Sequence, residues 1–150
     1  MNNQNTIQVR VHGESQNATR LNLTSGKFKL VIDEPESMGG TDAGPTPVQV
    51  LLMALAGCLN VTGHVVAQQR GMELQGMKIT LEGRLDPSAF MGHSSEVRAG
   101  FQYITVTITA DAPGATEEEL QAWVAETESR CPVTDNIYAE TDITIKVNRA

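Results

Sequence analysis

Residues 47–70 are the most apolar stretch of the chain, and they constrain its fold more than any other feature. Thr46 suits an N-cap, Pro47 suits the first helical position and Gly71 suits a helix stop, so the stretch is predicted to be one helix. Its apolar side chains surround the helix axis instead of following one stripe, which is typical of a helix buried on most sides. We therefore expect this helix to be the centre of the core.

A membrane-spanning role for this helix is not expected. Polar side chains interrupt the run before it reaches the roughly 18 unbroken apolar residues of a span. These side chains belong to Gln49, Asn60, Thr62 and His64. With 150 residues the chain has the size of one domain, predicted over residues 1–150. Because one chain of this size offers limited cover for so apolar a helix, a homodimer that buries it is a reasonable hypothesis.

Short runs of alternating apolar and polar residues flank the helix and predict strands. The predicted strands cover residues 7–11, 21–23, 28–32, 77–85 and 103–110, with a last strand around Ile143, Ile145 and Val147. Gly26 suits a tight hairpin turn between the second and third runs. The prolines and glycines of residues 33–46 indicate a loop, and the polar residues 86–100 indicate a lid or mobile loop.

A second helix is predicted to begin after Thr116, which forms a capping box with Glu119. It ends before Pro132, because proline breaks the helical pattern, and a short helix over residues 132–137 can follow. The order of elements predicts an α+β fold. In this fold an antiparallel sheet is backed by a long buried central helix and a second helix.

Charge and composition argue against several classes of function. Eighteen acidic and eleven basic residues leave a net charge of -7, which disfavours binding to nucleic acid and to anionic membranes. The polar residues 1–8 lack the pattern of a secretion signal, so a cytoplasmic location with reduced thiols is expected. The three histidines are scattered without the spacing of a zinc site, and no metal site is predicted.

Two cysteines are the main candidates for chemistry, and for each of them two interpretations stay open. Cys58 lies in the apolar helix, where it is either a small core residue or, because Gly57 beside it permits close approach, a reactive thiol. Cys131 lies at a helix break before Pro132, either by chance or because the next helix start and Arg130 favour its thiolate. A thiolate attacks the O–O bond of a peroxide, becomes a sulfenic acid and condenses with a second thiol.

Several motifs, taken in order, resemble those of the OsmC/Ohr superfamily over residues 20–148. They are Asp33-Glu34-Pro35, Gly39-Gly40, Gly44-Pro45-Thr46-Pro47, Leu55-Ala56-Gly57-Cys58 and Arg130-Cys131-Pro132-Val133. The resemblance implies an OsmC-like fold in an intertwined homodimer, with active sites at the subunit interface. It also implies a peroxidase of the oxidative stress response, in which Cys58 attacks an organic hydroperoxide and Cys131 resolves the product as a disulfide. The implied partners are a small hydrophobic hydroperoxide and a dithiol reductant such as a lipoylated protein, with no bound cofactor.

The chain departs from the peroxidases of that family at the residues that activate the thiolate. The family pairs a glutamate with an arginine, whereas this chain has Val48 at the glutamate position and Gln49 beside it. Arg20 is the candidate for the arginine, and Arg98 and Arg130 are alternatives. The departure leaves open a second function, a non-catalytic OsmC-like protein that binds a small hydrophobic ligand or senses redox state.

The histidines are not expected to assist the thiols. His64 and Cys58 lie about 240° apart around the axis of the predicted helix, so His64 is expected to be a core or surface residue. His93 lies in the polar loop with Arg98, and solvent exposure is the expected state of its side chain.

Overall fold

The computed structural model describes residues 6–149, which form two compact units, one from the chain up to Leu51 and one from Leu52 onward. The helix α1 (Pro47–Arg70) belongs to both units, and its predicted bounds are confirmed. The α+β class is also confirmed, with the strands in two antiparallel sheets. A single domain over residues 1–150 stays a prediction.

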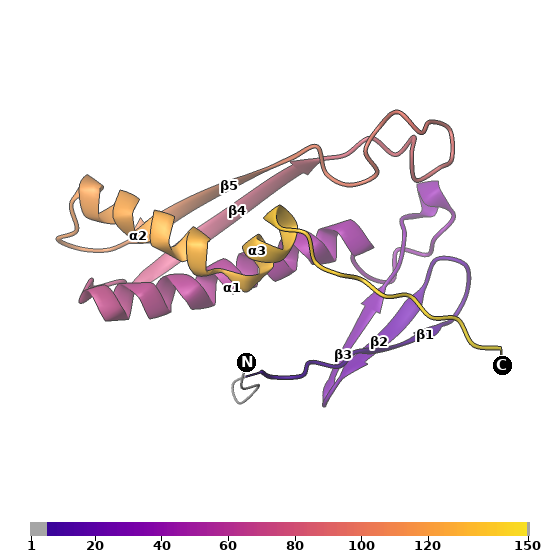
Figure 1. The fold of residues 1–150 in the computed structure, drawn as a ribbon, viewed down its shortest axis with the longest axis horizontal. Coiled ribbons are helices and arrows are strands. Elements are labelled where there is room, and N and C mark those ends of the chain that lie inside the picture. The colour runs from indigo at the N-terminus through magenta and orange to yellow at the C-terminus, as the bar shows by residue number, and fades with distance from the viewer. Residues whose placement is uncertain (1–5, 150) are drawn as a thin grey trace. The chain divides into compact units, whose positions relative to one another are not determined.

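The first unit contains a three-stranded antiparallel sheet of β1 (His12–Ser15), β2 (Leu21–Ser25) and β3 (Phe28–Ile32), in that order (Figure 1). A tight turn joins β2 to β3, and Gly26 adopts a φ of +58° in it, as expected of a glycine at this position. The predicted strand over residues 7–11 is wrong, because the paired residues begin only at His12. Since His12 already pairs with Thr24 near the end of β2, the residues before it have little strand left to pair with.

The loop that follows β3 is organised around the buried carboxylate of Asp33. This carboxylate accepts hydrogen bonds from the Thr41 hydroxyl at 2.6 Å and from the backbone N–H groups of Thr41, Glu34 and Ala43 at 3.1, 2.9 and 3.2 Å. These hydrogen bonds, with that of the Thr41 hydroxyl the largest contribution, hold the pKa of Asp33 well below its usual range. The loop also contains a short 3-10 helix, η1 (Glu36–Met38).

A reciprocal cap begins α1. The backbone N–H of Thr46 donates to Oε1 of Gln49 at 2.8 Å, and the N–H of Gln49 donates to Oγ1 of Thr46 at 3.4 Å. This arrangement is a capping box with glutamine at the third helical position, so it satisfies two N–H groups that the helix itself leaves free.

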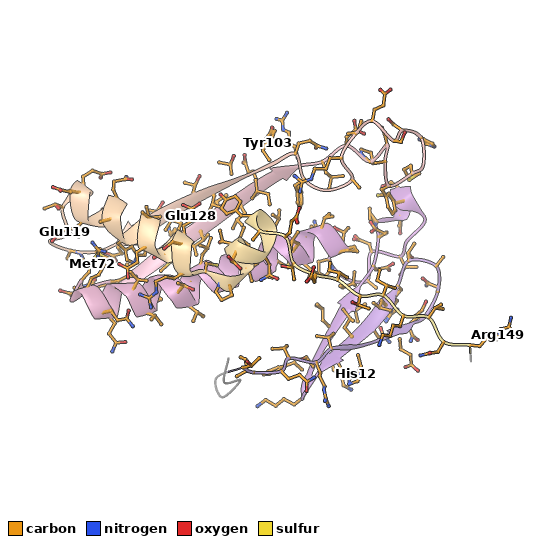
Figure 2. The ribbon with its side chains drawn as sticks, in the orientation of Figure 1. His12, Met72, Tyr103, Glu119, Glu128 and Arg149 are labelled. Carbon is orange, nitrogen blue, oxygen red and sulfur yellow. The ribbon has the colours of Figure 1, made fainter. Side chains whose placement is uncertain are left out.

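The second unit packs α1 against a long hairpin and two further helices. The hairpin consists of β4 (Gly76–Arg84) and β5 (Tyr103–Asp111), and the helices are α2 (Glu117–Arg130) and α3 (Pro132–Tyr138) (Figure 1). The capping box of Thr116 and Glu119 at the start of α2 is present as predicted. Met72 and Glu119 lie at the end of the unit where α1 stops and α2 begins (Figure 2).

One indole anchors α2 to α1. The side chain of Trp123 is buried, and its Nε1–H donates to the carbonyl oxygen of Gly63 at 2.8 Å. Val66 and Ala67 of α1 complete this cluster, against which residues of the hairpin and of α2 pack. The close approach depends on Gly63, since a β-carbon there would lie 2.9 Å from Cε of Met77 and 3.1 Å from Cζ2 of Trp123.

The prediction that α1 is buried on most sides is wrong for the single chain. Its buried residues follow one stripe, namely Leu55, Leu59, Gly63, Val66 and Ala67. Large apolar side chains on its other faces are exposed, among them Met53 and Val61, at 59% and 63% of their surface. One chain covers one face of α1, because the hairpin and α2 pack against that face only.

By length and composition alone, α1 is also long and apolar enough to cross a membrane. In the sequence the polar residues of the helix argued against a membrane span, but by these criteria they do not exclude one. The core helix of a soluble protein meets the same criteria, and the buried stripe of α1 against β4, β5 and α2 fits such a helix.

The predicted last strand is also wrong. Residues 139–149 have no regular secondary structure, and Ile143, Ile145 and Val147 are exposed over 81%, 90% and 94% of their surfaces. Among residues 6–149 no strand pairs with this segment, and a strand forms only where a neighbour accepts and donates its backbone hydrogen bonds. The segment thus has the alternating pattern of a strand but no partner strand in the described residues.

Two glycine substitutions in α1 test this packing. Gly63→Ala is expected to lower the free energy of unfolding by about 1 kcal/mol or more, because the new methyl group overlaps Met77 and Trp123. Gly57→Ala is the matched control in the same helix: no atom lies within 4 Å of the added carbon, so the better helix propensity raises stability by up to ~1 kcal/mol. Urea unfolding measures both. A destabilised Gly57→Ala variant would show that another surface covers Gly57.

A candidate dithiol site

The structure brings the two cysteines together, although they are far apart in the sequence. Cys58 lies on α1 and Cys131 lies at the junction of α2 and α3, and their side chains pack in one cluster with Leu55 and Leu59. Both are free thiols, and each affects the pKa of the other. The fold therefore gathers both cysteines in one apolar cluster.

The two sulphur atoms differ in their access to solvent. Cys131 is fully buried, whereas Cys58 is partly exposed. The side chains packed around the pair are apolar and come from the hairpin and from α3. They belong to Ile79, Leu81, Ile104, Val133 and Ile137. A small hydrophobic molecule that reaches Cys58 thus meets an apolar surface.

Hydrogen bonds favour the thiolate of Cys131. Burial opposes its charge, but the Thr134 hydroxyl, the Cys58 thiol and the backbone N–H groups of Thr134 and Val133 outweigh this opposition and lower the pKa of Cys131. Local geometry explains the arrangement. Cys131 is the N-cap residue of α3, with Pro132 at the first helical position, so its sulphur lies at the positive end of this short helix.

At Cys58 the net shift of the pKa has the opposite direction. Desolvation raises the pKa of the Cys58 thiol, and the contact with Cys131 raises it further, while the N–H of Val133 and the hydroxyl of Thr62 oppose the shift. When one proton leaves the pair, the charge is therefore expected on Cys131, with Cys58 donating its S–H to it. Ionising Cys58 therefore requires a further source of positive charge or a further hydrogen-bond donor.

The candidate arginines occupy three different environments. Arg130, which was expected to support the Cys131 thiolate, is bound elsewhere, because its guanidinium contacts Glu126 at 2.8 Å and Gln69 at 2.7 Å. Arg98 is exposed in the loop between β4 and β5. Arg20 lies in the first unit at the entry to β2, and its buried Nε has no hydrogen-bond partner among the described residues. Arg20 and Arg98 stay predictions as activating groups.

The two residues at the place of the family glutamate have no acidic role. The Gln49 side chain accepts the N–H of Thr46 in the helix cap, and Val48 is an exposed apolar residue. His64 and His93 are both exposed, as expected. Among residues 6–149, no group of three potential metal ligands comes together.

Sequence reasoning missed Thr134 and Thr62, the two residues whose hydroxyl groups lower the pKa values of the thiols. A usable signal was present for both. Thr62 stands four residues after Cys58 on the same helix, a spacing that places side chains side by side. Thr134 stands three residues after Cys131, the spacing at which a helix residue faces its own cap.

Comparison with known proteins agrees with the motif resemblance. A family model described as OsmC-like protein matches residues 40–146. The chain belongs to this family. No curated protein is similar enough in sequence to count as a match.

Solved structures of OsmC-like proteins share the fold of this family member. An OsmC-like protein from Mycoplasma pneumoniae has a TM-score of 0.75 at 17% identity, covering 87% of each chain. An organic hydroperoxide resistance protein OsmC from Legionella pneumophila has a TM-score of 0.65 at 23% identity, covering 88% of this chain and 90% of that one. The organic hydroperoxide resistance protein OhrB of Bacillus subtilis has a TM-score of 0.58 at 21% identity, covering 91% and 94%. At these identities the likeness establishes the fold alone.

Single-cysteine variants test the contact between the thiols of this OsmC-like protein. Cys58→Ala is expected to raise the pKa of Cys131, because the thiolate loses the S–H that stabilises it. Cys131→Ala is expected to lower the pKa of Cys58 from its value in the intact pair, because a neighbouring negative charge is removed. Thiolate absorbance near 240 nm, followed against pH, measures both pKa values. Shifts in the same direction in the two variants would contradict the shared proton.

Proposed function

We propose that this OsmC-like protein is a thiol-dependent peroxidase that reduces organic hydroperoxides through Cys58 and a Cys58–Cys131 disulfide. The observation that carries the proposal is the contact of the two thiols inside an apolar cluster. Two cysteines used only for packing have no need to meet. Membership of the OsmC-like family, which matches residues 40–146, agrees with a redox role.

The reaction proceeds in two steps at the pair. The Cys58 thiolate attacks one oxygen of the hydroperoxide, the O–O bond breaks, and the alcohol leaves after gaining a proton, so that Cys58 becomes a sulfenic acid. The Cys131 thiolate then attacks the Cys58 sulphur and expels hydroxide, which leaves as water. Two electrons have passed from the thiols to the peroxide. A dithiol reductant returns them and becomes a disulfide itself.

The surroundings of Cys58 favour an organic substrate. Cys58 is partly exposed, and it belongs to a cluster with aliphatic side chains such as Leu59, Leu81 and Ile137. An alkyl or aryl hydroperoxide buries apolar surface against such side chains, whereas hydrogen peroxide gains nothing there. The names of the Legionella and Bacillus relatives refer to organic hydroperoxide resistance, which points to the same class of substrate.

The activating charge is assigned to an arginine, because the pKa of Cys58 is raised by burial. Arg20 is the proposed group, since its buried Nε lacks a hydrogen-bond partner among the described residues. Arg98, in the exposed loop, is the alternative. A guanidinium within about 4–6 Å of a thiolate stabilises its charge.

A second function is favoured by one observation. The Gln49 side chain is used in the helix cap, and the residue beside it is Val48, so neither supplies a carboxylate to hold an arginine. A protein with a poorly ionised Cys58 would turn over slowly and would serve as a redox sensor or as a carrier of a small hydrophobic ligand. The rate of oxidation by a hydroperoxide separates this function from the first.

The proposed form of the protein is a homodimer in the cytoplasm. The exposed apolar face of α1, including Met53, Val61 and Val65, needs cover that one chain does not provide. The alternating residues of Ile143, Ile145 and Val147 form an unpaired strand pattern that a second copy is able to pair. Members of the family are soluble proteins, which agrees with the cytoplasmic location.

Oxidation by cumene hydroperoxide tests the peroxidase. One equivalent is expected to remove both thiols of the reduced wild-type protein and to leave a Cys58–Cys131 disulfide, as counted with a thiol reagent and seen by mass spectrometry. Cys58→Ser is expected to abolish the reaction, whereas Cys131→Ser still consumes hydroperoxide once and stops at the sulfenic acid. Two thiols that persist in the wild type would favour the sensor or carrier function.

Sedimentation of the wild type and two variants tests the dimer. The wild type is expected to be dimeric at micromolar concentration. Val61→Lys on the exposed face of α1 is expected to weaken association at least about tenfold, because a charge is placed in a buried apolar contact. Gln121→Lys serves as the control for an added charge, because it replaces an exposed polar residue of α2 outside the proposed contact. A wild-type monomer at this concentration would contradict the proposed assembly.

A further inference from the structure

The two cysteines of the oxidised pair have different surroundings, and this difference determines which sulphur a reductant attacks. This inference rests on the proposed Cys58–Cys131 disulfide. A reducing thiolate must attack one of the two sulphurs in line with the S–S bond, and the other sulphur then leaves as a thiolate. Two features decide between the sulphurs: which of them is accessible, and which of them is held as a charged leaving group.

Access favours Cys58. Its side chain is partly exposed, whereas Cys131 has no exposed surface. A shallow groove of about 300 Å³ lies on the outer side of α2 and α3 and is lined by Thr134 but not by Cys131. Carboxylates of Glu128 and Asp135 also line this groove, so an approaching thiolate is repelled there.

Stabilisation of the leaving charge favours Cys131. Thr134 is about nine-tenths buried at 8% exposure, and its hydroxyl has no nitrogen or oxygen partner among the described residues. Thr134 is the third residue of α3, whose N-cap is Cys131, and its hydroxyl is one of the groups that lower the pKa of Cys131. A buried hydroxyl without a partner costs free energy, so one aimed at a sulphur is in place for a charge that forms there.

We propose that the reductant attacks the sulphur of Cys58, that Cys131 leaves as the thiolate, and that the Thr134 hydroxyl donates a hydrogen bond to this thiolate. The first thiolate of a dithiol forms a bond to Cys58 as the S–S bond breaks, and the electron pair of that bond stays on Cys131. The second thiol of the reductant, once deprotonated, attacks its own sulphur in the mixed disulfide. The oxidised reductant leaves as a cyclic disulfide, and Cys58 is released as a thiolate that takes up a proton.

The test starts from protein oxidised with diamide, so it requires no hydroperoxide. The wild-type disulfide is treated with excess 2-mercaptoethanol, quenched with acid and mapped by peptide mass spectrometry. The mixed disulfide is expected on Cys58. An adduct on Cys131 would overturn the proposal, as would failure of diamide to link the two cysteines.

Substitutions at Thr134 test the hydroxyl. Reduction of the disulfide by dithiothreitol at pH 7 is expected to slow by about threefold or more in Thr134→Val, because a thiol of higher pKa is a poorer leaving group. Thr134→Ser keeps the hydroxyl and is expected to restore the rate. Thr127→Val is the matched control, since Thr127 is also buried but donates its hydroxyl to the carbonyl of Trp123 at 2.8 Å.

The results separate this inference from the proposed peroxidase. A wild-type rate in Thr134→Val, or equal slowing in Thr127→Val, would overturn the role of Thr134. A disulfide that forms with diamide and is reduced through Cys58, in a protein that does not react with cumene hydroperoxide, would defeat the peroxidase and leave the inference intact. If Thr134→Val does not fold, the adduct map of the wild type and the rate of Thr134→Ser still test the proposal.

Discussion

The packing of α2 onto α1 through Trp123 is the contact on which the second unit depends. The indole N–H donates to the Gly63 carbonyl, and Val66 and Ala67 enclose the ring from α1. Because α2 ends at Arg130, this anchor also determines where the next residue lies. An ion-pair network of Arg70, Glu126 and Arg130 joins the same two helices near that end. Cys131 is thereby placed against Cys58.

The chemistry of the pair follows from this placement. One sulphur is buried at the start of a helix, where N–H groups and a hydroxyl favour its charge, and the other lies on an apolar helix with partial access to solvent. Burial makes Cys58 a weak acid, and hydrogen bonds make Cys131 a better one. Such a difference suits a cycle in which one sulphur meets the substrates and the other accepts and releases charge. It also means that attack by Cys58 needs a positive charge from outside the pair.

The surface of a single chain leaves apolar residues without cover. The face of α1 that holds Met53 and Val61 is exposed, and residues 143–147 alternate like a strand without having one beside them. Both features are apolar, and the proposed second copy would bury the first and pair with the second. The proposed dimer therefore follows from the burial pattern of one chain, in addition to the family to which the chain belongs.

The sequence by itself determined the local elements of this protein. Thr46 with Pro47, and Thr116 with Glu119, are caps that act within a few residues, so the starts of α1 and α2 were predictable. The order of the motifs around Cys58 and Cys131 was also sufficient to indicate the family. The alternating pattern was misleading at residues 7–11 and 143–147. Such a pattern shows that a segment can form a strand, but the strand forms only if another strand is available to pair with it.

Only the tertiary structure decided which groups surround each sulphur. The contact between Cys58 and Cys131 joins distant parts of the chain, and the partners of Arg130 proved to be Glu126 and Gln69 instead of the adjacent thiol. The hydroxyl of Thr134 gained its meaning only when the fold buried it against Cys131. Caps and periodicity are short-range properties of the chain. Burial and the pKa of a thiol depend on every element packed around it, and one helix alone does not contain that information.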